Sequence, residues 1–111
     1  MNFSVEQVSN SAILSSHVEK LDISNVSELK NELILLNKNG INNVIFDMSK
    51  TRYCDSSGLS GILIGNRLCK DTNGLFILTG IQVNVMKMLK IAQLDKVLHI
   101  EESLESAKSN F

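Results

Sequence analysis

Residues Asp47–Asn66 read DMSKTRYCDSSGLSGILIGN, and the rest of the architecture can be worked out from them. The run just before them, Val44–Phe46, is apolar and rich in β-favouring side chains, which predicts a strand that is buried on both faces and ends at Asp47. After a polar loop, apolar residues recur at helical spacing from Leu59 onward. The pattern therefore predicts a buried strand, a loop and a helix that begins near Ser57.

The four residues Asp55–Gly58 have the composition of a helix N-terminus. Short polar side chains at such a position accept hydrogen bonds from the free N–H groups of the first helical turn. We therefore expect Ser56 and Ser57 to stand exposed where the helix starts. The positive end of the helix dipole and its free N–H donors tolerate an added anion there. In any α/β domain the same residues would also serve as a simple helix cap.

The composition is that of a single folded domain over residues 1–111, with 43% apolar and 21% charged residues. The net charge of -1 and the lack of a basic stripe argue against nucleic-acid binding. No apolar run approaches the roughly 18–20 residues that span a bilayer, and the first residues lack the features of a signal peptide. We expect a cytoplasmic monomer with neither nucleic acid nor membrane as a partner.

Few residues have the pattern of a metal or cofactor site. Cys54 and Cys69 make no disulfide framework, and no Cys/His set has zinc spacing. A buried, apolar role is expected for Cys54. Asp22, Asp47 and Asp55 could hold a cation in principle, but we expect them to cap helices and order loops. The sequence therefore predicts no metal and no cofactor.

Strands and helices alternate along the chain. The predicted strands are Phe3–Val8, Ala12–Val18, Asn43–Asp47, Leu75–Thr79 and Val97–Ile100. The predicted helices are one after Asn25 that stops at Gly40, one from Ser57 to about Asp71, one marked by Val85–Ala92, and a weak one over Leu104–Phe111. The order β-β-α-β-α-β-α-β-α predicts an α/β fold, a mixed and mostly parallel β-sheet packed with about four α-helices.

The helix starts should gather on one side of this sheet. Short loops and right-handed crossovers place the start of each helix at the carboxyl edge of the preceding strand, so Asp22, Asp47 and the two serines are expected to share one rim. That rim is where function usually sits in open α/β sheets. At the first helix, Asn25 and Glu28 resemble a capping box, with Ser24 as the competing cap.

The sequence contains no complete catalytic motif. Gly58–Gly61 stops one residue short of a Gly-x-Ser-x-Gly nucleophile elbow, because Ile62 stands where the second glycine is needed. His17 and His99 lie far from it along the chain, so a triad has little support, and packing or an edge position is expected for His99. No P-loop is present, and the three glycines that end with Gly65 are expected to let the helix lie close to the sheet. We therefore predict that the protein is not an enzyme.

The loop and its surroundings resemble the signature of the STAS domain, a family typified by bacterial anti-sigma factor antagonists. The resemblance rests on the Asp-x-Ser of Asp47–Ser49 and on the Asp-Ser-Ser-Gly-Leu of Asp55–Leu59. It extends over nearly the whole chain, from a two-strand start to the last three elements in order. Two details depart from the family: Glu19 stands where a glycine is common, and Asp22–Asn25 replaces the Asp-x-x-Thr of many antagonists.

The resemblance implies a non-catalytic switch. In antagonists of this kind, a serine kinase that is also the anti-sigma factor phosphorylates the second serine of the loop, which is Ser57 here. The unphosphorylated antagonist binds the anti-sigma factor, which then releases its sigma factor, and a serine phosphatase resets the phosphorylated form. Asp22 and Asp55 match the acidic residues around the acceptor. The implied partner-binding residues are Asp22, Ser24, Asp55, Ser56, Ser57, Gly58 and Leu59.

The residues leave other functions open. A STAS-type adaptor, such as a subunit of a lipid-transport complex, would dock through the same loop without phosphorylation. A small hydrolase using Ser57 would need a nearby base, and none is evident. Sensing of a nucleotide or a lipid is possible for the family fold, although no residue specifies a ligand. Ser56 is the near rival of Ser57 as the modified residue. Ser49 and Thr51 are more distant rivals, for which loop hydrogen bonds are the plain expectation.

Overall fold

The structure is a computed structural model that describes residues 1–111. Its elements are β1 (Phe3–Val8), β2 (Ser11–Ser16), β3 (Lys20–Leu21), α1 (Val26–Lys38), β4 (Asn43–Asp47), β5 (Tyr53–Cys54), α2 (Ser56–Asp71), β6 (Phe76–Thr79), α3 (Val83–Ile91), the 3₁₀ helix η1 (Leu94–Lys96), β7 (His99–Glu101) and α4 (Leu104–Lys108). The predicted α/β fold with four α-helices is confirmed. None of the helices combines the length and the apolar character needed to cross a bilayer.

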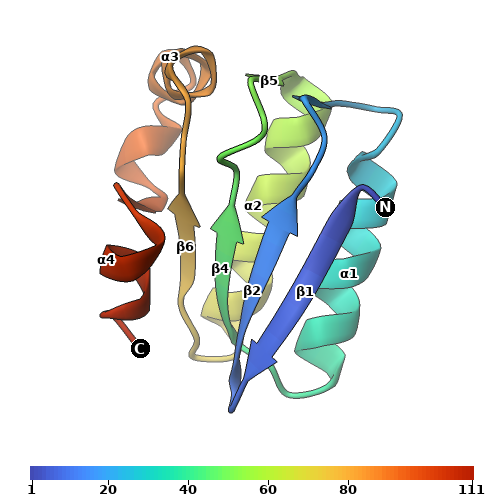
Figure 1. The fold of residues 1–111 in the computed structure, drawn as a ribbon, viewed down its shortest axis with the longest axis vertical. Helices are drawn as coiled ribbons and strands as arrows, with labels where there is room; N and C mark the ends of the chain where they lie inside the picture. Colours follow the sequence, from blue (N-terminus) through green and yellow to red (C-terminus); the bar gives the residue numbers. More distant parts are fainter.

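The main sheet has five strands in the order β1-β2-β4-β6-β7. β1 and β2 form an antiparallel hairpin, and every other neighbouring pair is parallel. The carboxyl ends of β2, β4 and β6 therefore lie at one edge, which is the upper edge in Figure 1, where β5 and α3 also lie. This confirms the mixed, mostly parallel sheet and identifies the edge that carries the loops of interest.

The two faces of the sheet are covered unequally. The larger core lies on the side of α1 and α2, where the Phe46 ring packs near the rings of Phe3 and Phe76. A much smaller cluster lies on the opposite face, where Ile45 and Ile77 pack against Ala107 of α4. In Figure 1, α1 and α2 run behind the sheet, while α4 lies beside β6.

Two short strands and a 3₁₀ helix were not predicted. β3 and β5 pair in parallel to form a separate two-stranded sheet, in which Lys20 lies opposite Tyr53 and Leu21 opposite Cys54. Two-residue strands are too short to show an alternating pattern, so no periodicity could reveal them. The last strand also begins later than predicted, because the 3₁₀ helix η1 occupies the chain before it.

The capping box expected at Asn25 and Glu28 was wrong. The Asn25 side chain makes no cap hydrogen bond to α1. Its Oδ1 accepts from the backbone N–H of Asp22 at 3.0 Å, and its Nδ2 donates to the carbonyl of Lys20 at 2.9 Å. Glu28 accepts instead from the Asn2 amide at 3.1 Å. Asn25 therefore closes the loop between β3 and α1, and this use of its amide competes with capping.

Candidate protein-interaction site

The loop that follows β4 is held by its own polar groups. The Asp47 carboxylate accepts from the backbone N–H of Ser49 at 3.0 Å, which turns the chain at the end of the strand. Thr51 is fully buried, and its hydroxyl donates to the carbonyl of Val18 and bonds to the Ser16 hydroxyl, both at 2.7 Å. The expected loop hydrogen bonding is thus confirmed for Thr51, and its burial leaves the hydroxyl inaccessible to another protein.

The β3–β5 ladder places two carboxylates on neighbouring chains. Leu21 and Cys54 are paired in parallel register, and the backbone N–H of Asp55 donates to the carbonyl of Leu21 at 3.2 Å. Asp22 and Asp55 follow these paired residues directly, and both side chains are half-buried. The two acidic residues predicted to flank the acceptor serine therefore lie at matching positions, directly after the ends of the paired strands β3 and β5.

Asp55 is the N-cap of α2. Its Oδ1 accepts a hydrogen bond from the backbone N–H of Gly58 at 3.0 Å, and its backbone carbonyl accepts one from the backbone N–H of Leu59, also at 3.0 Å. The backbone N–H groups of Ser56 and Ser57, the first two residues of the helix, have no partner within the protein. The predicted polar cap is confirmed, and two free donors remain at the positive end of the helix dipole.

Both serines at the start of α2 carry free hydroxyls. Ser56 is exposed and Ser57 is half-exposed, and neither hydroxyl makes a hydrogen bond within the protein. The carbonyl of Ser57 accepts from the Ser60 hydroxyl at 2.7 Å, which further orders the first turn. The site therefore presents two accessible hydroxyls on the ordered first turn of α2.

Gly58 lets the first turn of α2 pack directly against the β3–β5 ladder. A Cβ atom at this position would lie 2.5 Å from the carbonyl oxygen of Leu21 and 2.6 Å from the sulfur of Cys54, which is too close for any side chain. Gly65 similarly faces the Phe76 ring of β6 at 2.6 Å. The predicted close approach to a sheet is confirmed at these two glycines. It was wrong for Gly61, which faces Val26 and Leu29 of α1.

The first acidic residue of the site is held in its ionised form. The Ser24 hydroxyl donates to Asp22 Oδ1 at 2.6 Å, and the Ser24 backbone N–H donates to the same atom at 3.0 Å. These two bonds, the hydroxyl first, lower the pKa of Asp22 below its ordinary value of 3.8. Ser24 thus orients Asp22, and its exposed side chain lies at the border of the site.

The predicted binding residues differ in how much of them a partner could reach. Asp22, Ser24, Asp55, Ser56 and Ser57 all present surface, whereas Gly58 and Leu59 are buried. The Leu59 side chain packs in the larger core. These last two residues therefore shape the surface from beneath.

The cysteines have no reactive character. Burial, and after it the charge of Asp55, raises the pKa of Cys54 to about 12, and burial raises the pKa of Cys69 to about 11. Both thiols are buried and stay protonated near neutral pH. The expected buried role of Cys54 is confirmed.

The groups that could assist catalysis lie elsewhere. His17 bonds to the Ser4 hydroxyl at 2.7 Å, and neither histidine hydrogen-bonds to Ser57. His99 lies on β7 at the edge of the sheet, as predicted, and its Nε2 is 2.6 Å from Glu101 Oε2. No three His, Cys, Asp or Glu side chains come together in a metal-binding arrangement.

Exposed apolar residues surround the site, and sequence reasoning missed them. Ile23, between Asp22 and Ser24, is 74% exposed, and Tyr53 of β5 is 41% exposed. Val83 opens α3, which packs against β5, and is 69% exposed. Their only signal in the sequence was that they are apolar residues at the ends of polar segments. Exposed apolar side chains next to exposed polar groups are a feature of protein-binding surfaces.

Known proteins resemble the chain in both sequence and fold. The model of the STAS domain family matches residues 2–107. The anti-sigma-B factor antagonist of Staphylococcus epidermidis is 27% identical over 108 residues, which covers 95% of this chain and 98% of that protein. A protein of Thermotoga maritima has a TM-score of 0.89 at 23% identity, over 97% of this chain and 92% of that chain.

The anti-sigma factor antagonist SpoIIAA has been solved in two states. Its unphosphorylated form has a TM-score of 0.76 at 18% identity, over 97% of this chain and 94% of that chain. The phosphorylated form, from Bacillus, has a TM-score of 0.76 at 17% identity, over 97% of each chain. Structural likenesses at this level of identity establish the fold alone. Membership of a family is established by the match of the family model, which covers nearly every residue of the sequence. The chain therefore belongs to the STAS domain family.

Proposed function

We propose that the protein is an anti-sigma factor antagonist controlled by phosphorylation of Ser57. In its unphosphorylated form it binds an anti-sigma factor that is also a serine kinase, and the sigma factor is released. Phosphorylation of Ser57 by that kinase ends the binding, and a serine phosphatase restores it. The observation that carries the proposal is the free, accessible hydroxyl of Ser57 at the capped start of α2, beside Asp55.

Two likenesses support this role. The relative from Staphylococcus epidermidis, which is matched over almost its full length, is an anti-sigma-B factor antagonist. SpoIIAA, which has the same fold, exists in a phosphorylated form, and the present fold matches both of its forms with the same TM-score of 0.76. A STAS domain therefore accepts a phosphate without a change of fold, as a surface switch requires.

The start of α2 is suited to carry the phosphate without strain. A phosphoserine adds about -1.5 to -2 charges and three acceptor oxygens. The unpartnered N–H groups of Ser56 and Ser57 and the helix dipole favour that charge locally. The fold should consequently lose little stability when Ser57 is modified.

The same phosphate opposes binding. It would stand next to the Asp55 carboxylate, with ionised Asp22 just after the neighbouring strand β3. It would also add charge and bulk at the centre of a surface whose border is apolar, at Ile23 and Val83. Like-charge contacts and desolvation in such a place cost several kcal/mol, on the order of a thousandfold in affinity. One modification therefore abolishes docking while the domain stays folded.

Phosphorylation in vitro tests the assignment. The chain is incubated with its cognate serine kinase and ATP, and the modified residue is mapped by tandem mass spectrometry. Ser57→Ala should remain unmodified, whereas the matched control Ser56→Ala should be phosphorylated like the wild type. Modification at Ser56, Ser49 or any other position would refute the assignment. A chain that binds its partner but is never modified would favour the adaptor function.

A further inference from the structure

Two loops at the carboxyl edge of the sheet, one after β4 and one after β6, are packed directly on each other. The backbone N–H of Met48 donates to the carbonyl of Thr79 at 2.9 Å. Gly80 lies so close to Ser49 that a Cβ atom there would be 2.8 Å from the Ser49 backbone nitrogen. Its φ of +70° lets the chain turn at this point, as glycine does without steric cost. The two loops therefore meet just before α3 begins.

The side chain of Gln82 adds a hydrogen bond to this contact. Gln82 is the N-cap residue of α3, yet its side chain makes no cap hydrogen bond to its own helix. Its Nε2 donates instead to the carbonyl of Ser49 at 2.7 Å. Gln82 is half-buried and Ser49 is exposed, so the bond lies at the surface. The amide therefore joins two loops, and it fixes the start of α3 relative to the segment that leads into β5.

The residue that this bond places is Val83, which directly follows Gln82 and is 69% exposed. α3 packs against β5, and β5 leads through Asp55 into the helix that carries Ser57 (Figure 1). On the other side of β5, the paired strand β3 leads to Ile23, which is 74% exposed. Apolar side chains are thus exposed on both sides of the strand that precedes the acceptor serine. A partner that covers the serine would bury them.

We propose that Val83 belongs to the surface bound by the kinase partner, and that Gln82 is the positioning residue that holds it there. The proposal rests on the function proposed for Ser57 and adds the start of α3 to the same binding surface. The partner presents an apolar patch that covers Val83 while its catalytic site reaches Ser57. Because Val83 does not touch the reacting atoms, it stabilises the bound state and the transition state equally, and its loss raises KM without lowering kcat.

Phosphorylation kinetics test the role of Val83. Initial rates are measured with the cognate serine kinase while the concentration of the full chain is varied, and mass spectrometry maps the phosphate. Val83→Asp should raise KM about tenfold, as expected when a charge replaces an apolar side chain inside an interface, and kcat should stay unchanged. The matched control is Val97→Asp. Val97 is 59% exposed and lies just before β7, at the opposite edge of the sheet, so KM should not change.

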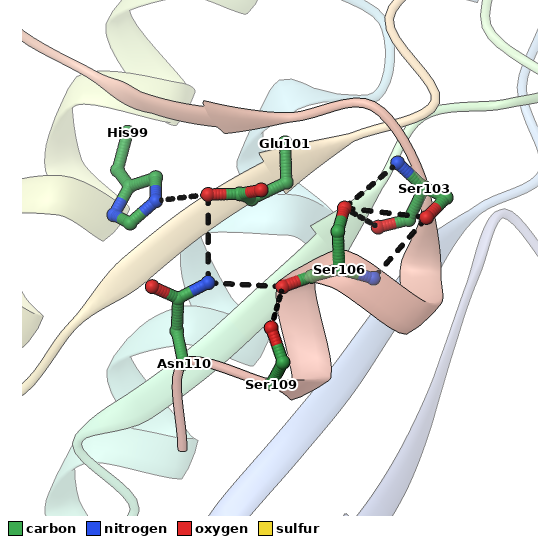
Figure 2. Close-up of polar contacts among 6 residues, drawn as sticks. All are labelled: His99, Glu101, Ser103, Ser106, Ser109 and Asn110. Carbon is green, nitrogen blue, oxygen red and sulfur yellow. Dashed lines mark hydrogen bonds and ion pairs between the residues drawn. The ribbon is translucent and has the colours of Figure 1, made fainter.

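Variants of Gln82 test the positioning bond. Gln82→Met keeps the length of the side chain and removes the donor, so KM should rise about two- to fivefold, as expected for the loss of one hydrogen bond. Gln82→Lys keeps a donor that can reach the Ser49 carbonyl and should recover most of the loss. The control is Asn110→Ala. The Asn110 amide also donates to a carbonyl, that of Ser106 at 2.9 Å, but it lies beside α4 (Figure 2), so KM should not change.

The possible results separate this proposal from the function proposed for Ser57. A wild-type chain that the kinase never modifies at Ser57 would refute the proposed function, and the role of Val83 with it. A wild type modified at Ser57, together with an unchanged KM in Val83→Asp, would refute the role of Val83 alone. A fall in kcat at constant KM, an equal rise of KM in Val97→Asp, or no recovery in Gln82→Lys would also overturn the proposal. Circular dichroism should show the same fold for every variant.

Discussion

The Asp55 carboxylate accepts a hydrogen bond from the backbone N–H of Gly58 at 3.0 Å, and this side-chain contact caps the helix that presents Ser57. Removing the carboxylate therefore changes stability as well as charge. Asp55→Ala should lower the free energy of unfolding by about 1 kcal/mol, the usual cost of losing an N-cap. Urea unfolding followed by circular dichroism measures the change.

The control for this prediction is Asp55→Asn, which keeps a capping oxygen and removes the charge. It should lose much less stability than Asp55→Ala. Equal destabilisation of the two variants would mean that the negative charge near the helix dipole, and not the cap hydrogen bond, stabilises the start of α2.

Gly58 is the position at which the smallest substitution should do the most harm. A methyl group there would meet the carbonyl oxygen of Leu21 at 2.5 Å and the sulfur of Cys54 at 2.6 Å, so α2 must move off the ladder. We expect Gly58→Ala to cost about 1–3 kcal/mol, as overpacking does elsewhere. Thermal unfolding provides the measurement, and Ser56→Ala, at the exposed first residue of α2, should be close to neutral. A Gly58→Ala protein as stable as the wild type would contradict the close contact.

Replacing Ser57 should separate the two states of the proposed switch. Ser57→Ala should bind the kinase partner constitutively, because its surface resembles the unphosphorylated form. Ser57→Asp should bind poorly, since it adds a third carboxylate beside Asp55 and Asp22. Calorimetric titration compares the affinities, and circular dichroism should show the same fold for both variants. Similar affinities of the two variants would contradict the electrostatic explanation.

The pair formed by Asp22 and Ser24 predicts a dependence on pH. Because the Ser24 hydroxyl and N–H lower the pKa of Asp22 below 3.8, the folded state binds a proton less readily than the unfolded chain. The stabilising contribution of Asp22 is therefore complete above its ordinary pKa and is lost as the pH falls through the lowered value. Carboxyl titration by NMR should show the pKa of Asp22 rising in Ser24→Ala, and an unchanged value would refute the role of Ser24.

The two thiols should be inert in the folded protein. With pKa values raised to about 12 for Cys54 and about 11 for Cys69, almost no thiolate exists at pH 7. Reaction with a disulfide reagent should therefore be slow in buffer and fast in urea. Rapid labelling of Cys54 in the native state would show that the ladder beneath α2 opens readily.

Strong local patterns allowed most of the fold to be predicted from the sequence. The alternation in Phe3–Val8, the buried run Asn43–Asp47 and the apolar spacing after Leu59 each identified an element whose type is confirmed. The Asp-Ser-Ser-Gly-Leu loop placed the start of α2 within one residue of its position. These features depend on neighbours in the chain, so a local pattern is sufficient to reveal them.

Features that depend on distant partners were missed. The β3–β5 ladder forms only because Leu21 pairs with Cys54, which is distant in the sequence. The Asn25 side chain does not cap α1 because its amide donates to the carbonyl of Lys20. Gly61 faces α1 because two helices pack side by side there. The exposure of Ile23 and Val83 likewise follows from where the loops lie in the finished molecule, and no periodicity encodes it.

The pairing of β3 with β5 also determines at which stage of folding the surface around Asp22 and Asp55 forms. Asp22 and Asp55 belong to segments separated by a helix and a central strand, and they become neighbours only after both have packed. In a growing or half-unfolded chain, Asp55 still precedes Ser57 by two residues, but Asp22 has not yet been brought to its side. The kinase proposed for Ser57, if it recognises the two carboxylates together, would therefore modify only copies that have finished folding.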